Sequence, residues 1–455
     1  MLFRFDEIRE AVGGTFLNTP RGDGVESVTT DSRTAAPQSL FIAISGEKFD
    51  GHDFLETAMN KGAALLCIER KKLAKLPPGA PAVVVDSTIK AYQDLARFHR
   101  LRLPVKAVAL TGSSGKTSTK EMLRAIFCRA YGAEHVLATE GNTNNQIGVP
   151  QNLLRLNADH KVCIIECGTN HHGEIEPLSR TIRPDAALIV SIGRCHLENL
   201  GSLEGVAAEK SELFRHLAPD GTAVLPLNSA GAGIMTRAAG NHPVLYYGSG
   251  DNSAMEAFYR GGSISGSSFD LLNHRTGERV TVNWCLSGEH QARNAAGAAA
   301  IATVFGIPMN VIAEGLSACV LPGMRMKITE HDGATWLNDA YNANPDSMRA
   351  TLDWLGEFAV PENLVLVLGD MREVGSSSQT VHRETLAKAK TDFPGARIIA
   401  VGAEMTRAAQ SLNDPRIQTY PDSRTAADPV RQMIRPGDLV FLKASRGTRL
   451  ELVEP

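Results

Sequence analysis

The chain has 455 residues, of which 43% are hydrophobic and 21% are charged, and its formal net charge is −3. This length exceeds what a single hydrophobic core supports, so two or three globular domains are expected. Lysine and arginine are spread along the sequence and no apolar run approaches the length of a membrane span, which argues against a nucleic-acid-binding or polybasic membrane role.

The cysteines and the first residues bear on the cellular compartment. Seven cysteines are scattered along the chain. Cys163 and Cys167 fall in one apolar, strand-like run, and we expect them in a core rather than at a metal. The segment Met1–Glu7 lacks the apolar stretch of a secretory signal peptide. These features predict a protein of the reducing cytoplasm.

A small α/β domain is expected over residues 1–103. Strands are predicted at 39–44, 64–68 and 82–85, and helices at 55–62 and 89–101.

From Val105 the alternation of strands and helices predicts a second domain, residues 104–319, with a mainly parallel sheet covered on both faces. Its strands are predicted at 105–110, 135–139, 162–167, 186–192 and 222–225. Residues 246–286 alternate differently and are typical of antiparallel strands and turns, and 291–305 read as an alanine-rich helix.

A break at Leu321-Pro322-Gly323 precedes a third domain, residues 320–455. Strands are predicted at 335–338, 364–368, 397–401 and 438–442, with helices between them. This pattern predicts a doubly wound, Rossmann-like domain, so the whole chain is expected to be α/β.

The run Thr111-Gly112-Ser113-Ser114-Gly115-Lys116-Thr117-Ser118 lies between a predicted strand and a predicted helix, as a phosphate-binding loop does. Its glycines let backbone N–H groups close around phosphate oxygens, and the helix N-terminus adds a positive dipole end. Lys116 is expected to reach the β- and γ-phosphates, and the Thr117 hydroxyl to bind Mg²⁺. Leu110 replaces the first glycine of the usual pattern, and a chance Gly-Lys-Thr turn is the alternative that the flanking elements disfavour. The sequence therefore predicts use of a nucleoside triphosphate.

Polar side chains follow several predicted strands, which is where ligands bind in open α/β sheets. Glu166 ends an apolar run and offers the carboxylate that Mg²⁺ prefers, with a buried structural glutamate as the alternative. For His196, after the next strand, a ligand role and a structural role are about equally supported. The amide-rich run Asn142–Asn145 favours binding over a plain turn. Lys210 lies on an amphipathic helix, and from pattern alone it is a solvated surface lysine.

Two further features point to ligand contacts. His290 and Asn294 are four residues apart and share a helix face, where capping and ligand binding are about equally supported. In the third domain the polar loops 338–347, 369–375 and 443–447 each follow a strand. Turn chemistry explains any one of them, but three at one sheet edge predict a binding site.

These segments, in this order, resemble the Mur ligase family of ATP-dependent amide-forming enzymes over essentially the whole chain. The resemblance rests on T-G-S-S-G-K-T-S-x-K-E-M at Thr111–Met122, G-N-x-N-N-x-I-G-V-P at Gly141–Pro150, D-A-Y-N-A-N-P-D-S-M at Asp339–Met348 and L-G-D-M-x-E-x-G at Leu368–Gly375. It implies a ligase that adds D-alanyl-D-alanine to the UDP-N-acetylmuramoyl tripeptide through an acyl phosphate. The D-N-P-R run typical of the family's diaminopimelate-adding enzymes does not occur in the last domain.

The resemblance also implies the site residues, with ATP and two Mg²⁺ ions as cofactors and a monomer as the functional unit. The implied catalytic residues are Lys116, Lys210, His196 and Glu166. The implied metal positions are Thr117, Glu166, His196 and Lys210, the last as a carbamylated lysine. The implied ATP contacts are Thr111, Gly112, Ser113, Ser114, Gly115, Lys116, Thr117, Ser118, Asn294, Arg325, Asp339, Tyr341 and Asn342. The implied substrate contacts are Thr30, Asp31, Ser32, Arg33, Ser45, Gly46, Lys48, Phe49, Asn142, Asn144, Asn145, Asn344, Ser445 and Arg446.

Three alternatives stay open on the sequence. One is another amino-acid-adding Mur ligase, and a second is an enzyme like folylpolyglutamate synthetase, which the uridine-nucleotide-type N-terminal domain disfavours. A third, from a different class, is a P-loop ATPase without ligase activity, which leaves Glu166, His196 and Lys210 unexplained.

Overall fold

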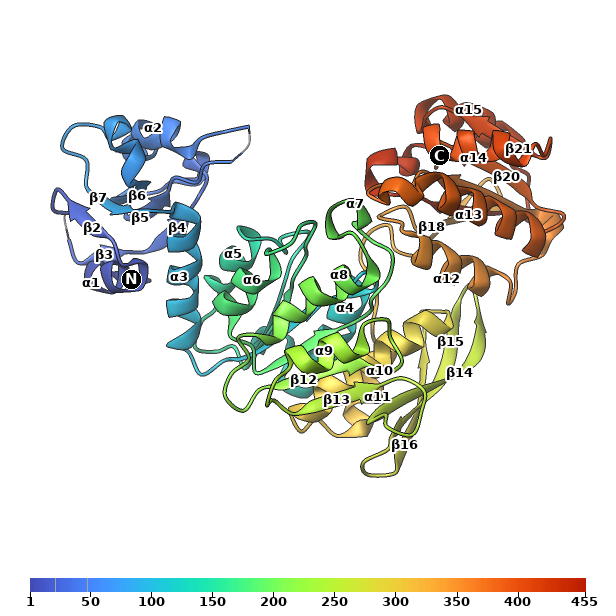
Figure 1. Cartoon of the computed structure of the whole chain (residues 1–455), viewed down its shortest axis with the longest axis horizontal. Coiled ribbons are helices and arrows are strands. Elements are labelled where there is room, and N and C mark those ends of the chain that lie inside the picture. Colours follow the sequence, from blue (N-terminus) through green and yellow to red (C-terminus); the bar gives the residue numbers. More distant parts are fainter. Residues whose placement is uncertain (21, 47) are drawn as a thin grey trace.

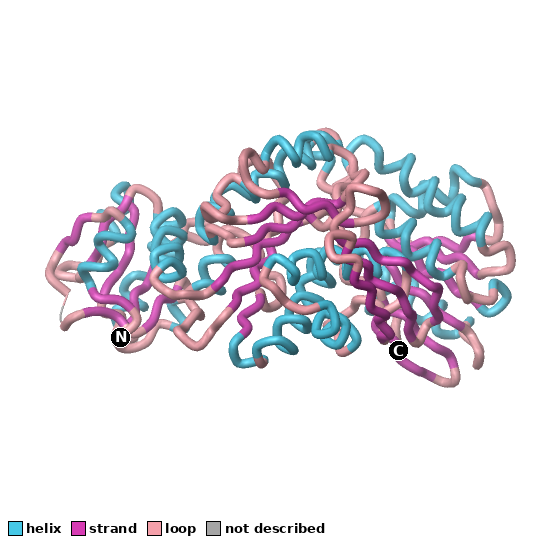
Figure 2. The backbone as a smooth tube through the Cα atoms, turned by 90° about the horizontal axis from the view of Figure 1, so that it is seen from below, coloured by secondary structure: helices cyan, strands magenta, loops and turns pink. Residues whose placement is uncertain are grey.

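The computed structural model describes residues 1–20, 22–46 and 48–455. Three units, each built around its own main β-sheet, follow one another along the chain and lie in a row (Figure 1 and Figure 2). The chain therefore has the three-domain α/β architecture that the alternation of strands and helices predicts. Within the described residues, no helix combines the length and the apolar character needed to span a membrane.

The first unit is a five-stranded sheet in the order β2-β7-β6-β5-β4, parallel except for β2, which runs antiparallel to β7. Its elements are β1 (Phe3–Arg4), α1 (Phe5–Val12), β2 (Thr15–Leu17), β3 (Gly24–Val25), β4 (Ser27–Thr29), η1 (Ser32–Thr34), β5 (Ser39–Ile42), η2 (Gly51–Phe54), α2 (Leu55–Asn60), β6 (Leu65–Glu69), η3 (Arg70–Lys75), β7 (Ala82–Val85) and α3 (Thr88–Leu101). The predicted strands and helices occur within two residues of their expected ends. Before Val28 the sequence predicts no element, because a single short helix and strands of two or three residues carry little periodicity.

The second unit is a nine-stranded sheet in the order β16-β15-β14-β13-β12-β11-β8-β10-β9. Neighbouring strands are parallel from β9 across to β14, whereas β14, β15 and β16 are antiparallel. Its strands are β8 (Lys106–Thr111), β9 (Val136–Ala138), β10 (Val162–Glu166), β11 (Ala186–Ile189), β12 (Thr222–Pro226), β13 (Val244–Tyr247), β14 (Met255–Ser263), β15 (Gly266–Asn273) and β16 (Glu278–Trp284). Its helices are α4 (Lys116–Tyr131), η4 (Ala133–His135), α5 (Gly148–Leu153), α6 (Ile175–Ile182), α7 (Leu197–Leu200), α8 (Leu203–Ser211), η5 (Glu212–Phe214), α9 (Ala232–Ala238), α10 (Glu289–Val304) and α11 (Met309–Ser317).

The expectation of antiparallel strands over 246–286 is correct for β14 to β16 but wrong at its start. Tyr246 and Tyr247 belong to β13, which pairs in parallel with β12. A single short strand carries no signal for the direction of its partner, so the sequence could not separate β13 from the hairpins that follow it.

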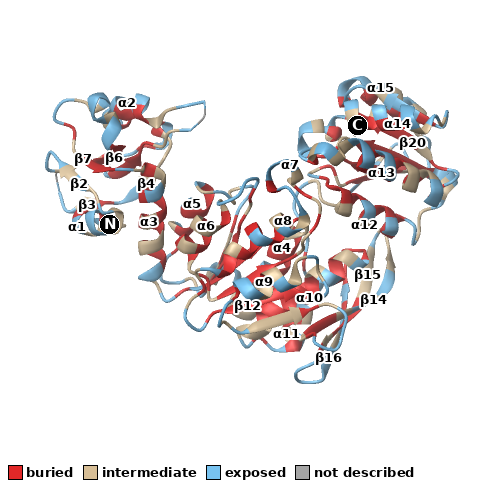
Figure 3. Cartoon of the chain, viewed as in Figure 1, coloured by how far each residue is buried: buried red, intermediate tan, exposed pale blue. Residues whose placement is uncertain are grey.

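Strands β8, β10, β11 and β12 of the central sheet are buried on both faces, whereas β14, β15 and β16 are partly exposed (Figure 3). Along β8, Val108 and Leu110 contribute to the core beneath α4, α10 and α11, while Ala107 and Ala109 contribute to the core beneath α5, α6 and α9. This alternation is the two-residue period of a strand with a helical layer on each side.

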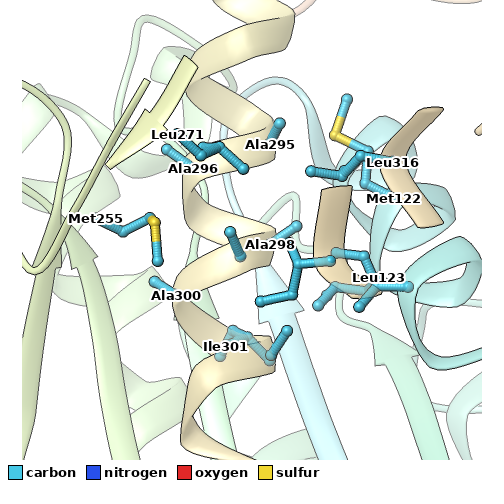
Figure 4. Close-up of a cluster of buried hydrophobic side chains, with 14 of the residues drawn as sticks. Met122, Leu123, Met255, Leu271, Ala295, Ala296, Ala298, Ala300, Ile301 and Leu316 are labelled. Carbon is cyan, nitrogen blue, oxygen red and sulfur yellow. The ribbon is translucent and has the colours of Figure 1, made fainter. Parts of the chain in front are cut away.

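Helix α10 owes its alanine-rich sequence to its central position. Figure 4 shows Ala295, Ala296 and Ala298 on α10, which lies between Met255 and Leu271 on one side and residues of α4 and α11 on the other. A Cβ atom on Gly297 would lie 2.9 Å from the Tyr247 ring. Small side chains therefore allow α10 to approach its neighbours closely. The N-terminal part of this helix borders the phosphate loop that is described below.

The third unit is a six-stranded sheet in the order β17-β18-β22-β19-β20-β21, parallel except for β17, which pairs antiparallel with β18. Its elements are β17 (Lys327–His331), β18 (Ala334–Asn338), α12 (Pro345–Leu355), η6 (Pro361–Asn363), β19 (Leu364–Gly369), η7 (Gly375–Ser377), α13 (Ser378–Asp392), β20 (Arg397–Val401), α14 (Ala403–Leu412), β21 (Ile417–Tyr420), α15 (Ser423–Met433), β22 (Leu439–Lys443), η8 (Arg446–Thr448) and η9 (Leu450–Leu452). Because β22 lies between β18 and β19, the loops after these three strands leave the sheet at one edge.

Helix α3 joins the first unit to the second and is buried in both. Tyr92 and Leu95 lie in the core of the first unit, whereas Ala96 lies in a core of the central unit. Arg180 of α6 lies 2.5 Å from Asp94, so an ion pair accompanies the apolar contact.

Candidate active site

The phosphate loop connects β8 to α4 at the carboxyl end of β8, which has β11 on one side in the sheet and β10 and β9 on the other. Gly115, at the N-terminus of α4, has a φ of 79°, which favours glycine. Lys116 Nζ donates to Gly112 O at 2.7 Å, so the ammonium lies over the loop. Ser114 N donates to Ser191 Oγ in the loop after β11. The loop is thus fixed by its neighbour strand, at the crevice where open α/β sheets bind ligands.

Glu166 lies next to the first turn of α4, as its position at the end of β10 predicts. Its carboxylate accepts from Thr117 Oγ1 and from Asn144 Nδ2, each at 3.0 Å. The residue is buried. Three predicted site residues therefore meet, and they gather hydroxyl, carboxylate and amide oxygens, the kind that a hard divalent cation binds.

Arg325, from the segment before β17, also contacts this cluster. Its Nη2 donates to Thr117 Oγ1 at 3.0 Å, and its guanidinium carbon lies 3.6 Å from the centre of the Tyr341 ring. This cation–π contact places an aromatic ring and a fixed positive charge beside the phosphate loop.

Asn344 brings the third unit onto the phosphate loop. Its Nδ2 donates to Ser113 O at 3.2 Å and to Ser114 Oγ at 2.8 Å. Its side-chain oxygen accepts from Ser347 N and caps α12. One residue therefore positions a helix and joins two domains.

Ser445 ties together the three loops that the sequence predicts at one edge. Ser445 N donates to Asp370 O, its Oγ donates to Ala343 O, and Arg372 N donates to Ser445 Oγ. The three loops do meet, and the hydroxyl of Ser445 is engaged within the protein.

Asn294 and His290 lie on α10, and Asn294 lies against the same loop. A Cβ on Gly115 would lie 2.8 Å from Asn294 Oδ1, so Asn294 packs directly on the phosphate loop. Burial, together with nearby Lys443, lowers the pKa of His290 to about 4. Lys443 forms an ion pair with Asp339, which places Asp339 near this helix.

Lys210 is buried, with 1% of its surface exposed, so the expectation of a surface lysine from pattern alone was wrong. Burial lowers its pKa to about 8, and the charge of Lys116 acts in the same direction.

His196 pairs with a residue of the third unit, and its Nδ1 lies 2.5 Å from Glu373 Oε2. The His196 ring lowers the pKa of the Glu373 carboxyl. Across the described residues, no three His, Cys, Asp or Glu side chains gather into a group able to hold an ion.

A cavity of about 980 Å³ adjoins Thr117, between the central unit and the start of the third. Its lining residues are Thr117, Lys120, Glu121, Arg124, residues 136–142, Arg155, His160, residues 320–325, Tyr341 and Arg446. Asn142 and Arg446, both implied substrate contacts, lie here. The volume is that of a small-molecule site and is large enough for a nucleoside.

Comparisons with known proteins now decide the family. Three family models match: Mur ligase middle domain over residues 110–302, Mur ligase, glutamate ligase domain over 324–446, and Mur ligase family, catalytic domain over 24–111. The chain is 34% identical over 451 residues to the UDP-N-acetylmuramoyl-tripeptide–D-alanyl-D-alanine ligase of Bacillus subtilis (strain 168), covering 98% of this chain and 96% of that protein. The chain belongs to the Mur ligase family. It is thus an enzyme of the ATP-dependent, amide-forming ligase class.

Solved structures agree with this assignment. The crystal structure of MurF from Acinetobacter baumannii superposes on this Mur ligase with a TM-score of 0.89 at 30% identity, over 99% of this chain and 97% of that chain. The MurF ligase of Thermotoga maritima in complex with ADP has a TM-score of 0.82 at 23% identity, over 94% and 96% of the two chains, and shares the fold.

In this Mur ligase the implied uridine-nucleotide contacts lie in two loops of the first unit. Asp31 caps η1 and hydrogen-bonds the guanidinium of Arg33, with Thr30 and Ser32 on either side. In the second of them Gly46 N donates to Phe49 O, and Ser45 and Asp50 form an isolated β-bridge. Phe49 is 76% exposed, and Lys48 beside it is also exposed. Glu47 lies outside the described residues.

The carboxylate of Asp50 organises this second loop. It accepts from Ser45 Oγ at 2.9 Å, from His52 Nδ1 at 2.7 Å, and from Lys72 and Lys75 Nζ at 2.9 Å each. Burial raises the pKa of Asp50, but these donors outweigh it and hold the pKa well below its usual range.

Other predicted residues have local structural partners. Asn145 Oδ1 accepts from Ile147 N and Gly148 N at the start of α5. Asn342 Oδ1 accepts from Ala343 N, and Arg446 pairs with Glu451. Thr111 and Ser118 flank the phosphate loop and are buried. Cys163 and Cys167 lie in a hydrophobic core, as predicted.

Sequence reasoning missed several residues of the site. Ser191 holds the phosphate loop, Arg194 N donates to Asp346 Oδ2 at 2.7 Å, and Glu373 and Lys443 pair with predicted residues. Ser191, Arg194 and Glu373 lie in loops that follow strands, Asp346 lies in the first turn of α12, and Lys443 ends β22, so position near a strand end was the available signal. Their partners come from distant parts of the chain, and nothing in the sequence gives that pairing.

Proposed function

We propose that this Mur ligase joins the amine of D-alanyl-D-alanine to the terminal carboxyl group of the UDP-N-acetylmuramoyl tripeptide, using ATP. The observation that carries the proposal is the contact of Asn344 with Ser113 and Ser114. It lays the Asp339–Met348 motif, by which the chain resembles the D-alanyl-D-alanine-adding ligases, directly on the phosphate loop. The name of the Bacillus subtilis relative supports the same substrates.

The chemistry takes two steps. A carboxylate oxygen of the tripeptide attacks the γ-phosphorus of ATP, the bond to the β,γ-bridging oxygen breaks, and ADP leaves. The amine nitrogen of D-alanyl-D-alanine then attacks the acyl carbon, inorganic phosphate leaves, and the nitrogen loses a proton. Phosphorylation is needed because a free carboxylate offers no leaving group to an amine.

Residues of the phosphate loop stabilise the first step. Lys116, held over the loop by Gly112 O, balances the charge that develops on the transferred phosphoryl group. Asn294 and the stacked pair of Arg325 and Tyr341 border the loop and suit contacts with the remainder of ATP, together with Asp339 and Asn342. Positioning of this kind supplies most of the catalysis in phosphoryl transfer.

Thr117 and Glu166 fit one Mg²⁺ ion, since their oxygens lie 3.0 Å apart beside the loop. When bound there, Mg²⁺ supplies positive charge that reduces repulsion between the anionic carboxylate and ATP. We assign a second ion to Glu166, His196 and carbamylated Lys210.

The surroundings of Lys210 support its carbamylation. The neutral amine attacks the carbon of CO₂, loses a proton and becomes a carbamate, and a pKa near 8 leaves an appreciable neutral fraction at physiological pH. The reaction replaces a buried cation near Lys116 with an anion, so repulsion between the two residues becomes attraction.

We assign a different part of substrate binding to each of the three units, whose boundaries we place at residues 1–103, 104–319 and 320–455. The first binds the uridine nucleotide through Thr30–Arg33 and the loop from Ser45 to Phe49. The second binds ATP and presents Asn142, Asn144 and Asn145 to the substrate. The third closes over the site with Asn344, Ser445 and Arg446. We propose that the enzyme works as a monomer in the cytoplasm.

The test is phosphate release from ATP with the UDP-N-acetylmuramoyl tripeptide, with and without D-alanyl-D-alanine. Release that requires both, with a pentapeptide product by mass spectrometry, is the expected result. Release with a different amine would assign the chain to another amino-acid-adding Mur ligase. Release that needs neither partner would overturn the proposal in favour of a simple ATPase.

A further inference from the structure

His196 and Glu373 face each other across the junction between the central and third units. His196 comes just before α7, and Glu373 lies in the loop after β19. The distance from His196 Nδ1 to Glu373 Oε2 is 2.5 Å. His196 Nδ1 is buried from solvent and has no aligned hydrogen-bond partner among the described residues, so its short contact with Glu373 is an ion-pair contact.

Both residues have strained backbones. The φ of His196 is 50° and that of Glu373 is 62°, in the left-handed region that residues with a side chain rarely adopt. Strain of this kind persists only where the surrounding structure imposes it, and it gathers at functional sites. Here the two strained residues contact each other.

Neighbouring contacts hold the pair in place. Arg194 N donates to Asp346 Oδ2 at 2.7 Å, two residues before His196. A Cβ on Gly375 would lie 3.2 Å from Glu198 Cα, two residues after each member of the pair. The segment 193–198 therefore meets the third unit at three successive points, and the histidine is at the middle one.

We propose that Glu373 is a positioning residue that orients His196 for the second metal ion when the third unit is docked. Once the ring is aligned for the ion, this carboxylate accepts the Nδ1 proton, which fixes the ring and leaves the lone pair on Nε2 to bind a divalent cation. Histidines that bind metals commonly donate their other N–H to a carboxylate. In this enzyme the carboxylate belongs to a different domain, so the metal site is complete only when the domains meet. The inference rests on the proposed assignment of His196 to that metal site.

The experiment measures Mn²⁺ binding by the electron paramagnetic resonance of free Mn²⁺, with a non-hydrolysable ATP analogue and without carboxylate or amine substrates. The chains compared are the wild type, Glu373→Ala, His196→Ala and the double variant. Glu384→Ala is the matched control, because Glu384 also pairs with this segment, at 3.8 Å from Arg194, and its side chain is exposed to a similar extent.

Glu373→Ala is expected to weaken the second Mn²⁺ site by roughly 10- to 100-fold, the range found when outer partners of metal ligands are removed. His196→Ala should weaken it at least as much, and the double variant no more than His196→Ala, because Glu373 acts through the ring. Glu384→Ala should change it less than twofold. Thermal unfolding and small-angle scattering of each variant verify that the fold and the docking of the third unit are retained.

Losses of Mn²⁺ affinity that multiply in the double variant would overturn the inference. So would an equal loss in Glu384→Ala, which would make the pair a docking contact only. Unchanged Mn²⁺ binding in His196→Ala would also overturn it. Because no ligation substrate is present, the outcome is independent of the product assay. A chain that fails to make the pentapeptide yet follows this pattern would contradict the proposed function and leave the metal inference standing.

Discussion

The guanidinium of Arg325 stacks 3.6 Å from the centre of the Tyr341 ring. The same guanidinium donates to Thr117 on the phosphate-loop helix. Arg325, at the start of the third unit, thus contacts a proposed metal ligand of the central unit and an aromatic ring of its own unit.

Arg325→Ala should lower kcat/KM for ATP by roughly 10- to 100-fold, since it removes a charge-assisted hydrogen bond and a cation–π contact. Arg325→Lys should recover only part of this, because an ammonium cannot stack and donate in the same geometry. Steady-state kinetics with varied ATP measures both, with KM for D-alanyl-D-alanine as the internal control. A lysine variant with wild-type kinetics would contradict the role given to stacking.

Substitutions of Asn344 can separate its two roles, which are capping α12 and joining the third unit to the phosphate loop. Asn344→Asp keeps the oxygen that caps α12, so the free energy of unfolding should change by less than about 0.5 kcal/mol. It loses the Nδ2 donor and sets a carboxylate against Ser113 O, so KM for ATP should rise by roughly tenfold. Asn344→Ala should also lose about 1 kcal/mol of stability. Denaturant unfolding and ATP kinetics together test this, and equal effects of both variants on stability would contradict the capping argument.

Lys210→Met should abolish ligation and yet stabilise the protein at pH 7 in CO₂-depleted buffer. Burial lowers the folded-state pKa of Lys210 to about 8, below the unfolded value, so the buried charge destabilises the native state at pH values below 8. The gain in unfolding free energy is at most about 3 kcal/mol, from the pKa difference.

The pH dependence has a definite sign. As pH rises from about 8 toward the unfolded pKa near 10.5, the native state gives up its proton first, and the stability of the wild type rises toward that of the variant. Thermal unfolding at pH 7, 9 and 10 measures the difference. A difference that widens over this range would contradict the argument.

Asp50→Asn tests the nucleotide-binding role of the first unit. The amide cannot balance Lys72 and Lys75, so the contacts that hold Ser45 and His52 on residue 50 should weaken. KM for the UDP-linked substrate should rise by roughly tenfold with KM for ATP unchanged, since two charge-assisted hydrogen bonds weaken. Asp53→Asn, which removes a partner of Lys75 only, is the control and should have a smaller effect. Equal changes in both KM values would point to general destabilisation.

Local patterns were predictable because they are set by neighbouring residues. The phosphate loop, Glu166 at the end of β10 and the three polar loops of the third unit lie where strand and helix periodicity put them. Strand order was not predictable: that β8 lies between β10 and β11 decides that Ser191 touches Ser114, and no short-range signal carries it.

Lys210 shows the limit of residue-level reasoning. A lysine on a helix is usually solvated, and only the family resemblance marked it, whereas the structure buries it near Lys116. Neither the residue pattern nor the family resemblance predicted the pairing of His196 with Glu373, because this pairing depends on how two separately folded units dock.

The contact between the first and central units differs in composition from the contact between the central and third units. This difference predicts which of the two contacts breaks during the substrate cycle. Helix α3 supplies apolar side chains to the cores on both of its sides, and Arg100, largely buried, pairs with Asp185 at 2.9 Å. The contacts of Asn344, Arg194 and His196 with their partners are polar. Water can replace polar contacts at little net free energy, but it cannot replace a shared core. The first unit should therefore behave as a rigid arm of the central body, and the substrate cycle should be driven by rotation of the third unit alone.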